Sequence, residues 1–335
     1  MVRLGCLGYG AWGRNVARVA HATPGATLVV VGEPDPRRRA EARERLPGVE
    51  VAENHDAVLA RADVDAILLA THASSHAELA EACARAGKHV LVEKPLALDP
   101  ASARKAAAAA ERAGIVLQVG HLLRYHPAVE LLFRVAREEL GRIRSVASQR
   151  LNFGALRSDE NVLFSLGPHD LSVMLALFGA PPVSVAAHGA AFVRKGVEDL
   201  AFLTLRFADG GLGSVHLSWL DPHKVRRITV VGERKMAVFD DMEPREKVRI
   251  YDQSVEAPPG YAVYGENLSL RFGDICVPAF PAHEPLSVEI AHFVQCVANG
   301  EPPRTGAAEG IAVVEVLAAA QRSLRAGGAP ISLAG

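Results

Sequence analysis

Two spacings of apolar residues divide the chain into two regions. From residue 1 to about 120, short apolar runs alternate with longer segments in which apolar residues recur every three or four positions. Short runs of this kind are typical of buried strands, and the longer segments are typical of helices that pack along one face. This alternation predicts an α/β fold, with a parallel sheet covered by helices on both faces, over residues 1–120.

The predicted strands of this region are 2–7, 26–31, 63–70, 88–93 and 115–119, and its predicted helices are 15–22, 37–46, 77–86 and 100–113. Asp35-Pro36 and Asp99-Pro100 are typical helix N-cap and first-turn pairs, whereas Gly114 is typical of a helix end. Ligands of open α/β sheets bind beyond the carboxyl ends of the strands. The residues that follow each strand are therefore expected to share one edge of the sheet.

Beyond His121, runs of alternating polar and apolar residues predict a mostly antiparallel sheet. Its expected strands are 145–151, 183–187, 200–207, 213–219, 225–231 and 235–239. A helix is predicted over 127–140, and helices over 169–178, 287–298 and 307–325 are expected to cover one face of the sheet, giving an α+β domain over 121–335. Residues 253–285 are rich in Gly and Pro and predict a long excursion. The open face of the sheet is a candidate for self-association.

Composition narrows the classes of protein. The chain has 335 residues and a formal net charge of −1, and it has no run of apolar residues long enough for a membrane span. Nucleic-acid and membrane partners are therefore not expected. The four cysteines are far apart and are expected to be reduced, and the start of the first strand beside Met1 predicts a cytoplasmic protein. No spacing of His, Cys or acidic residues predicts a metal site.

A glycine motif follows the first predicted strand. Gly8, Gly10 and Gly13 have the spacing of the dinucleotide-binding turn, in which a helix N-terminus faces the pyrophosphate. Glu33 follows the second strand, where a carboxylate accepts hydrogen bonds from the adenosine ribose. Glu33 favours NAD over NADP. Arg37 and Arg38 leave NADP as the alternative cofactor. This basic cluster either lies on a solvated helix face or attracts the phosphate of a cofactor.

Two residues are candidates for proton transfer. Lys94 follows a buried strand and precedes a proline, and loss of hydration there would lower the pKa of its amine into the range of a general base. A lysine at a strand end that points to water is the alternative. His169 lies in a Gly-Pro-His-Asp turn that predicts the start of a helix, and it either relays a proton or caps that helix. His72, His76 and His121 lie near the same predicted edge, as pocket or packing residues.

The chain resembles the glucose–fructose oxidoreductase, inositol dehydrogenase and MocA family, Gfo/Idh/MocA. The resemblance is carried by residues 86–97, Ala-Gly-Lys-His-Val-Leu-Val-Glu-Lys-Pro-Leu-Ala, by the glycine motif, and by the motifs at 124–127, 167–171 and 285–293. The resemblance implies an N-terminal Rossmann domain, a C-terminal domain with a large open sheet for oligomerisation into a dimer or tetramer, and NAD(P)-dependent oxidation or reduction of sugars and related alcohols. It implies that Lys94 is the catalytic lysine and His169 the active-site histidine. The family often has Asp where this chain has Ser165 and Ser172, which weakens an Asp-Lys-His relay and disfavours an inositol substrate.

The candidate site residues follow from these patterns and from the resemblance. The candidate cofactor-binding residues are Gly8, Gly10, Ala11, Trp12, Gly13, Glu33, Arg37, Thr71, His76, Glu93 and Lys94. The candidate substrate-binding residues are Lys94, His121, Arg124, Tyr125, Arg157, Asn161, Ser165 and His169.

Residues 157–170 and 218–226 are similar to family members that act on nucleotide sugars, such as UDP-N-acetylglucosamine 3-dehydrogenases. That similarity implies oxidation of a ring hydroxyl at C3, and Arg157, Lys224 and Arg226 are candidates to bind a diphosphate, or else surface charges. A dehydrogenase or reductase of a free sugar, deoxy sugar or polyol is an alternative within the same class. A non-catalytic sensor of NAD(H) is an alternative of another class.

Overall fold

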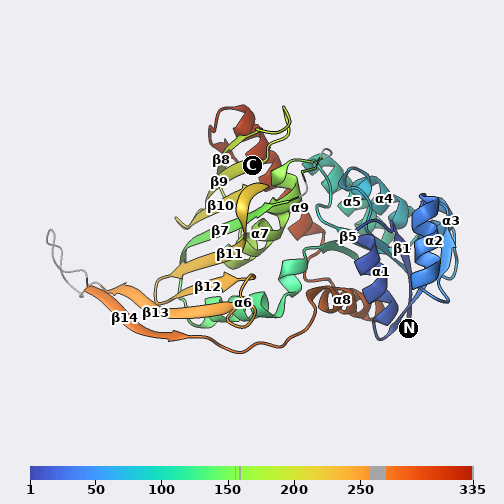
Figure 1. Cartoon of the computed structure of the whole chain (residues 1–335), viewed down its shortest axis with the longest axis horizontal. Coiled ribbons are helices and arrows are strands. Elements are labelled where there is room, and N and C mark those ends of the chain that lie inside the picture. The colour runs from blue at the N-terminus through green and yellow to red at the C-terminus, as the bar shows by residue number, and fades with distance from the viewer. Residues whose placement is uncertain (155, 158–159, 257–268, 334–335) are drawn as a thin grey trace. The chain divides into compact units, whose positions relative to one another are not determined.

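The computed structural model of the chain describes residues 1–154, 156–157, 160–256 and 269–333 (Figure 1). It divides into two compact units. The first unit comprises Met1–His126 and His283–Ala318, and the second comprises Pro127–Ala282 and Ala319–Gly335. In the described ranges, no helix has both the length and the apolar character needed to cross a membrane.

The first unit is built on a six-stranded parallel sheet, as the alternating pattern predicts. Its strands are β1 (Val2–Leu7), β2 (Ala26–Gly32), β3 (Glu50–Ala52), β4 (Ala66–Leu69), β5 (His89–Glu93) and β6 (Leu117–Gly120), in the order β3-β2-β1-β4-β5-β6. The central strands are almost wholly buried. All six run in the same direction, so the residues after β1, β4 and β5 lie at one edge of the sheet.

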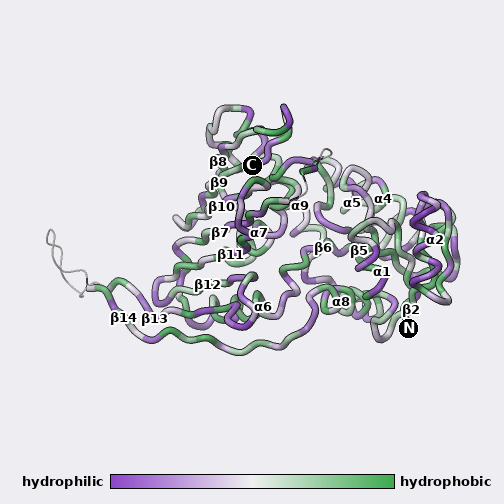
Figure 2. Tube along the Cα trace, in the orientation of Figure 1, coloured by the Kyte–Doolittle hydropathy of each residue, from purple (hydrophilic) through white to green (hydrophobic). Residues whose placement is uncertain are grey.

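The helical segments of the first unit are α1 (Gly13–Ala22), α2 (Pro36–Arg45), α3 (His55–Leu59), η1 (Ala73–Ser75), α4 (His76–Arg85), α5 (Pro100–Ala113), η2 (Leu122–Tyr125), α8 (Pro285–Asn299) and the start of α9 (Ala307–Arg325). The predicted caps are confirmed. Asp35 accepts a hydrogen bond from the Arg37 amide, and Asp99 accepts one from the Ser102 amide. Only Ala42 of α2 is buried, and Figure 2 shows this helix as hydrophilic along its length.

Helix α8 packs in the first unit, so the prediction that it covers the second sheet is wrong. Its apolar side chains join one core cluster with residues of α1 and β1. Ile290 and Phe293 are fully buried in this cluster. The spacing of apolar residues predicted the helix α8 correctly. It could not predict which sheet the helix covers, because an apolar helix face can pack against any apolar surface of the right shape.

The second unit contains a nine-stranded mixed sheet that is mostly antiparallel, as predicted. Its strands are β7 (Ile143–Phe153), β8 (Ser184–Ala190), β9 (Leu200–Arg206), β10 (Leu212–Ser218), β11 (Leu220–Gly232), β12 (Met236–Asp240), β13 (Val248–Glu256), β14 (Ser269–Cys276) and β15 (Ile331–Ser332), in the order β14-β13-β12-β11-β7-β10-β9-β8-β15. Burial alternates along β9: Ala201, Leu203 and Leu205 are buried, whereas Phe202 and Thr204 are exposed. One face of the sheet is therefore covered and the other is open.

Helices α6 (Pro127–Glu138) and α7 (Val162–Phe178) pack on the covered face (Figure 1). Helix α7 begins seven positions earlier than the predicted start at His169. Asn161 caps it by accepting a hydrogen bond from the Phe164 amide, and Pro168 lies inside the helix. Proline in a helix interior lacks the amide that would donate to the preceding turn. That disruption made the Gly-Pro pair resemble a helix start in the sequence.

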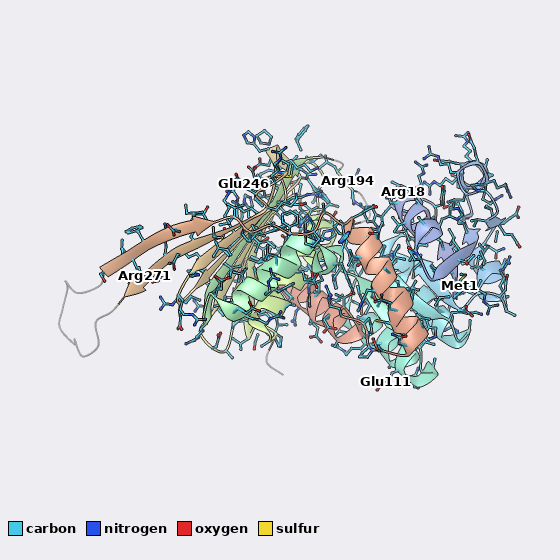
Figure 3. The ribbon with its side chains drawn as sticks, turned by 90° about the horizontal axis from the view of Figure 1, so that it is seen from below. Met1, Arg18, Glu111, Arg194, Glu246 and Arg271 are labelled. Carbon is cyan, nitrogen blue, oxygen red and sulfur yellow. The ribbon has the colours of Figure 1, made fainter. Side chains whose placement is uncertain are left out.

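Residues 253–285 are not a single excursion without structure, which corrects the sequence interpretation. The end of β13 and all of β14 lie in this range, while residues 257–268 lie outside the described residues. Arg271, labelled in Figure 3, donates to Ser254 of β13 and to the carbonyl of Arg234. Strand β14 is at the edge of the sheet and largely exposed, so it lacks the buried alternation by which the other strands are predicted.

Candidate functional site

The turn after β1 has the geometry of a pyrophosphate cradle. Gly8 has a φ of +91°, and a Cβ there would lie 2.6 Å from the carbonyl oxygen of Ala70. A Cβ on Gly13 would lie 2.2 Å from the carbonyl oxygen of Gly8. A Cβ on Gly10 would meet only the Arg38 Nη1, at 3.8 Å. Gly8 and Gly13 therefore permit the close packing, and Gly10 leaves the backbone open at the start of α1, where an anion is stabilised.

Glu33 lies beside this turn, at the end of β2. Its side chain is only 3% exposed, and its two oxygens accept hydrogen bonds from the amides of Tyr9, at 2.6 Å, and Asp35, at 2.9 Å. The Arg38 guanidinium lies near this carboxylate, with Nη1 3.9 Å from Glu33 Oε1, and the Arg39 guanidinium donates to the Glu33 backbone carbonyl at 3.2 Å. Arg37 is exposed and contributes its amide to Asp35. Glu33 thus holds the turn in place as well as carrying the charge expected for ribose recognition.

The ends of β4 and β5 are joined by a buried histidine. His76 Nδ1 lies 2.7 Å from the carbonyl oxygen of Pro95, and Nε2 lies 3.3 Å from that of Thr71. Burial lowers the pKa of His76, so the ring is neutral and the shorter contact assigns its proton to Nδ1. Both predicted cofactor residues of this segment, Thr71 and His76, therefore bind the backbone or side chains of the protein; Thr71 also shares a hydrogen bond with Ser75.

Lys94 follows β5, and its peptide bond to Pro95 is cis. The adjacent Glu93 accepts a hydrogen bond from the Trp12 indole, with Nε1 2.5 Å from Oε1, and one of 3.3 Å from the Lys94 amide to Oε2. Residue 93 as a whole keeps some exposure, but its carboxyl is surrounded by protein, and this loss of hydration raises its pKa. The structure thus brings the glycine turn, through Trp12, to the residue beside Lys94.

The residues after β6 are more buried than their sequence suggests. His121 is 1% exposed, and burial, with the charges of Arg124 and Lys94, lowers its pKa to about 3. Neither ring nitrogen of His121 has a hydrogen-bond partner among the described residues. The Tyr125 hydroxyl is 2.9 Å from Thr305 Oγ1, and burial raises the pKa of this phenol. Tyr125, a predicted substrate residue, is therefore fully enclosed in the first unit.

The remaining candidates lie in the second unit. His169 is in the middle of α7, and Asp170, the next residue, forms a buried ion pair with Arg150 of β7. The Ser172 hydroxyl donates to the carbonyl of His169, at 2.9 Å. Asn161 caps α7 and also donates to Glu198 and Gln321, both at 2.6 Å. Ser165 is 5% exposed.

Two of the three predicted diphosphate cations are paired within the second unit. Arg157 lies 2.9 Å from Glu160, and Arg226 lies 3.2 Å from Asp241. Lys224 is exposed. A diphosphate bound by these arginines would therefore compete with carboxylates that already occupy them.

Sequence reasoning missed two buried charged groups. Arg150 lies two positions after Ser148 and four after Val146 on β7, so the alternation of the strand places it on the same buried face. This alternation could have predicted its burial. Glu289 lies on the apolar face of α8 with Ile290 and Phe293, and it is 0% exposed. A charged residue at a periodic apolar position is rare enough to single out.

Comparison with known proteins identifies the family. Residues 2–121 match the model described as "Oxidoreductase family, NAD-binding Rossmann fold", and residues 131–238 match the GFO/IDH/MocA C-terminal domain. The chain belongs to the Gfo/Idh/MocA family of oxidoreductases. It is 30% identical to UDP-N-acetylglucosamine 3-dehydrogenase of Acidithiobacillus ferrooxidans, over 95% of each chain.

Other relatives of the same family have different substrates. The chain is 28% identical to scyllo-inositol 2-dehydrogenase (NAD(+)) of Bacillus subtilis, over 99% of this chain and 96% of the relative. GenD2 from gentamicin A biosynthesis, solved in complex with NAD, is 27% identical with a TM-score of 0.83, over 100% of this chain and 97% of the other. The protein is thus an oxidoreductase that acts on CH–OH groups, with an NAD-binding Rossmann domain, in a family of sugar and polyol dehydrogenases.

The open backbone at Gly10 gives a direct test of the cradle. We expect Gly10→Ala to weaken NADH binding at least tenfold, because the methyl group would occupy the space that a pyrophosphate needs. The midpoint of thermal unfolding should stay within a few degrees of that of the natural chain, because an added Cβ meets nothing closer than 3.8 Å. Calorimetric titration and thermal unfolding measure the two effects. Gly13→Ala is the contrasting variant, expected to lower the unfolding midpoint; unchanged NADH binding in Gly10→Ala would refute the assignment.

Glu289 predicts a dependence of stability on pH. Burial and the charge of Glu93 raise its pKa well above the unfolded value of about 4.3. A charge on Glu289 would also raise the pKa of Tyr125 of η2, while Arg18 of α1 pairs with Glu284 near the start of α8. The stability associated with Glu289 is therefore complete below about pH 4 and is lost as the pH rises towards its folded pKa.

Glu289→Gln cannot ionise and should lack this loss. We expect its free energy of unfolding, relative to the natural chain, to rise between pH 5 and pH 8 by about 1–3 kcal/mol. Urea unfolding across this range measures the difference. Glu111→Gln, on the surface of α5 (Figure 3), is the matched control and should show no such trend. A flat difference for Glu289→Gln would mean that Glu289 is ionised in the folded protein.

Proposed function

We propose that this chain oxidises a ring secondary hydroxyl of a nucleotide sugar, at C3 of a substrate such as UDP-N-acetylglucosamine. The observation that carries the proposal is the 30% identity to a UDP-N-acetylglucosamine 3-dehydrogenase along nearly the whole of both chains. Serines at positions 165 and 172, where the family often has aspartates, favour this substrate over an inositol. We further propose that residues 1–120 bind the dinucleotide and that residues 121–335 bind the sugar and associate with other copies.

In the proposed reaction, NAD supplies the hydride acceptor. The Lys94 amine takes the proton of the substrate hydroxyl as the C–H bond breaks, and His169 holds that hydroxyl. Lys94 suits this role because it follows the buried strand β5 at the edge where parallel sheets bind ligands. Ser165 and Arg124 are further candidates for contact with the sugar. Asn161 and Tyr125, whose polar atoms bind protein groups, are assigned to holding the backbone around the site.

The proposed substrate can be tested by thermal unfolding with ligands. UDP-N-acetylglucosamine should raise the unfolding midpoint beyond that reached with NAD⁺ alone, because a ligand that binds only the folded state stabilises it. The same mixture should form NADH, measured by its absorbance. The alternative, a free sugar or polyol, is favoured by the identity to scyllo-inositol 2-dehydrogenase, and a response to inositol or glucose but not to UDP-sugars would establish it.

Lys94→Met is the control for catalysis. It should keep NADH affinity within a fewfold and lower kcat by about 10²–10⁴, the usual contribution of a general base. Retained turnover in Lys94→Met would exclude Lys94 as the base, whatever the substrate. NADH binding without turnover of any alcohol by the natural chain would favour the NAD(H) sensor.

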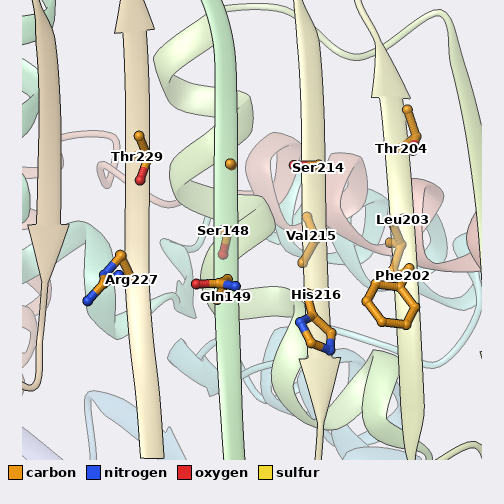
Figure 4. A pocket seen from close by; sticks show the side chains of 11 residues that line it. Ser148, Gln149, Phe202, Leu203, Thr204, Ser214, Val215, His216, Arg227 and Thr229 are labelled. Carbon is orange, nitrogen blue, oxygen red and sulfur yellow. The ribbon is translucent and has the colours of Figure 1, made fainter.

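We also propose that the open face of the second sheet binds a second copy of the chain. Arg227, Gln149, His216 and Phe202 lie in register across four neighbouring strands and line a groove of about 380 Å³ (Figure 4). The rings of Phe202 and His216 stack at 4.2 Å, and Arg227 is paired with Asp240. With the arginine of this groove neutralised by Asp240, the face suits a self-complementary contact between identical sheets.

The next row of this face consists of small residues, among them Thr229, Ala147, Ser214 and Thr204. Ser214→Arg would place a long charged side chain in the middle of the proposed interface, and we expect it to convert the oligomer to a monomer. Light scattering after size-exclusion chromatography measures the mass. Ala40→Arg on the exposed α2 is the matched control and should leave the mass unchanged. A monomeric natural chain, or an unchanged mass for Ser214→Arg, would refute this interface.

A further inference from the structure

Trp12 is an exposed aromatic residue in a unit whose other aromatic side chains are buried. The first unit, all of which the structure describes, has four residues of the types Phe, Tyr and Trp. Tyr9, Tyr125 and Phe293 are at most 2% exposed, whereas Trp12 is 41% exposed. Trp12 lies within the glycine turn, directly before α1. A large apolar ring left open beside a ligand-binding turn is typical of a surface that a ligand covers.

The indole ring is held in place although it is exposed. Its Nε1 donates to Glu93 Oε1 at 2.5 Å, and the other oxygen of Glu93 accepts the Lys94 amide proton at 3.3 Å. Gly120 of β6 is in register with Glu93, and a Cβ at position 120 would lie 3.2 Å from the Glu93 carboxyl, so the glycine leaves room for it. The indole therefore loses little rotamer freedom when a ligand binds, which is the advantage of a preorganised site.

The contact with Glu93 places the indole at the nicotinamide end of the dinucleotide site. Glu33, which is expected to bind the adenosine ribose, lies at the end of β2, and β2 and β5 are on opposite sides of β1 in the sheet. The indole extends from the glycine turn towards β5. Lys94, the proposed base, follows Glu93 in the chain. A base that takes the hydroxyl proton has to lie near the ring that takes the hydride, so the nicotinamide is the part of the cofactor expected beside Trp12.

The two oxidation states of a nicotinamide differ in charge. The oxidised ring is a pyridinium cation, whereas the reduced ring is neutral. A cation is attracted to the electron-rich face of an aromatic ring, and tryptophan is the best partner among the aromatic side chains. Donation of the indole proton to the Glu93 carboxyl moves electron density into the ring of Trp12, which strengthens this attraction.

We propose that Trp12 is a specificity-determining residue for the oxidation state of the cofactor: its indole binds the nicotinamide ring and favours the pyridinium of NAD⁺ over the neutral ring of NADH. Trp12 thereby favours uptake of NAD⁺ and release of NADH, which is the direction of alcohol oxidation. The proposal takes the place of the nicotinamide from the proposed role of Lys94 and does not depend on which sugar the enzyme oxidises.

Binding of NAD⁺ and of NADH to the full-length protein, measured by calorimetric titration without a sugar, tests this preference. Trp12→Leu keeps an apolar side chain but removes the ring, and we expect it to weaken NAD⁺ binding about three- to tenfold more than NADH binding. The ratio of the two dissociation constants cancels any loss caused by a shifted glycine turn, because both forms share the pyrophosphate and the riboses. Equal losses for both forms, or no loss for either, would overturn the proposal.

Phe192→Leu is the matched control. It removes a ring that is 68% exposed in the second unit, and it should leave the ratio of the two dissociation constants unchanged. Should Trp12→Leu fail to fold, Trp12→Phe provides the same test with a smaller effect, because a phenyl ring attracts a cation less strongly than an indole.

Glu93→Gln separates the ring from the carboxylate beside it. A glutamine oxygen still accepts the indole proton, so the ring stays in place while the negative charge is removed. We expect Glu93→Gln to keep most of the preference for NAD⁺ that Trp12→Leu loses. A preference that vanishes in Glu93→Gln but persists in Trp12→Leu would mean that the charge of Glu93, and not the indole, selects the cofactor.

Tryptophan fluorescence reports the contact without turnover. The chain has two tryptophans, and Trp219, in the second unit, is 3% exposed. In Trp219→Phe only Trp12 emits, and saturating NAD⁺ should quench most of this emission, because an excited indole transfers an electron to a pyridinium only at contact. In Trp12→Phe the emission of Trp219 should change little. Undiminished Trp12 emission while calorimetry shows bound NAD⁺ would refute the contact.

The same measurement separates this proposal from the proposed role of Lys94. Quenching of Trp12 by NAD⁺, together with retained turnover in Lys94→Met, would support the contact at Trp12 while excluding Lys94 as the base. Should Trp219→Phe fail to fold, the emission of the natural chain minus that of Trp12→Phe gives the contribution of Trp12, and its loss on NAD⁺ binding is expected in the same way.

Discussion

The first unit depends on the close approach of backbone to backbone in the turn after β1. The carbonyl oxygen of Gly8 would be only 2.2 Å from a Cβ on residue 13, and that of Ala70 only 2.6 Å from a Cβ on residue 8. Only glycine at both position 8 and position 13 allows α1 to start directly after the end of β1. This constraint fixes the N-terminus of α1 at the edge where β4 and β5 end. The position of the dinucleotide site follows from sterics before any contact with a ligand is considered.

Side chains then tie the neighbouring segments to this turn. Glu33 receives the amide of Tyr9, His76 joins the residues after β4 and β5, and Glu93 receives the indole of Trp12. Each is a polar group in a mostly buried place, where an unsatisfied donor or acceptor costs about 1–3 kcal/mol. These hydrogen bonds can all form in only one arrangement of the chain. They therefore fix the positions of the three loops after β1, β4 and β5, which have no regular structure of their own.

The sequence predicted the parts of the fold that are governed by local rules. The parallel unit followed from alternating strands and helices, and the caps at Asp35 and Asp99 followed from residue types that bind free amides. The placement of α8 and the strand β14 did not follow. A helix period specifies an apolar face but not its partner, and an exposed edge strand lacks the buried alternation that identifies a strand. At the site, the order of residues indicated Glu93 and Lys94, but only the fold reveals that Glu289, nearly two hundred residues later, is fully buried and accepts a hydrogen bond at its backbone carbonyl from Gln118 of β6.

The second unit holds a different kind of buried charge. The ion pair of Arg150 with Asp170 joins β7 to α7, and both residues are nearly inaccessible to water. Hydration lost by two such ions largely cancels their attraction, so the pair adds little net stability. Removing either partner would nevertheless leave an uncompensated charge in the interior. The pair therefore acts mainly on geometry: it holds α7 against the sheet at the residue that follows His169, and this fixes where along the helix that histidine lies, despite the missing amide at Pro168.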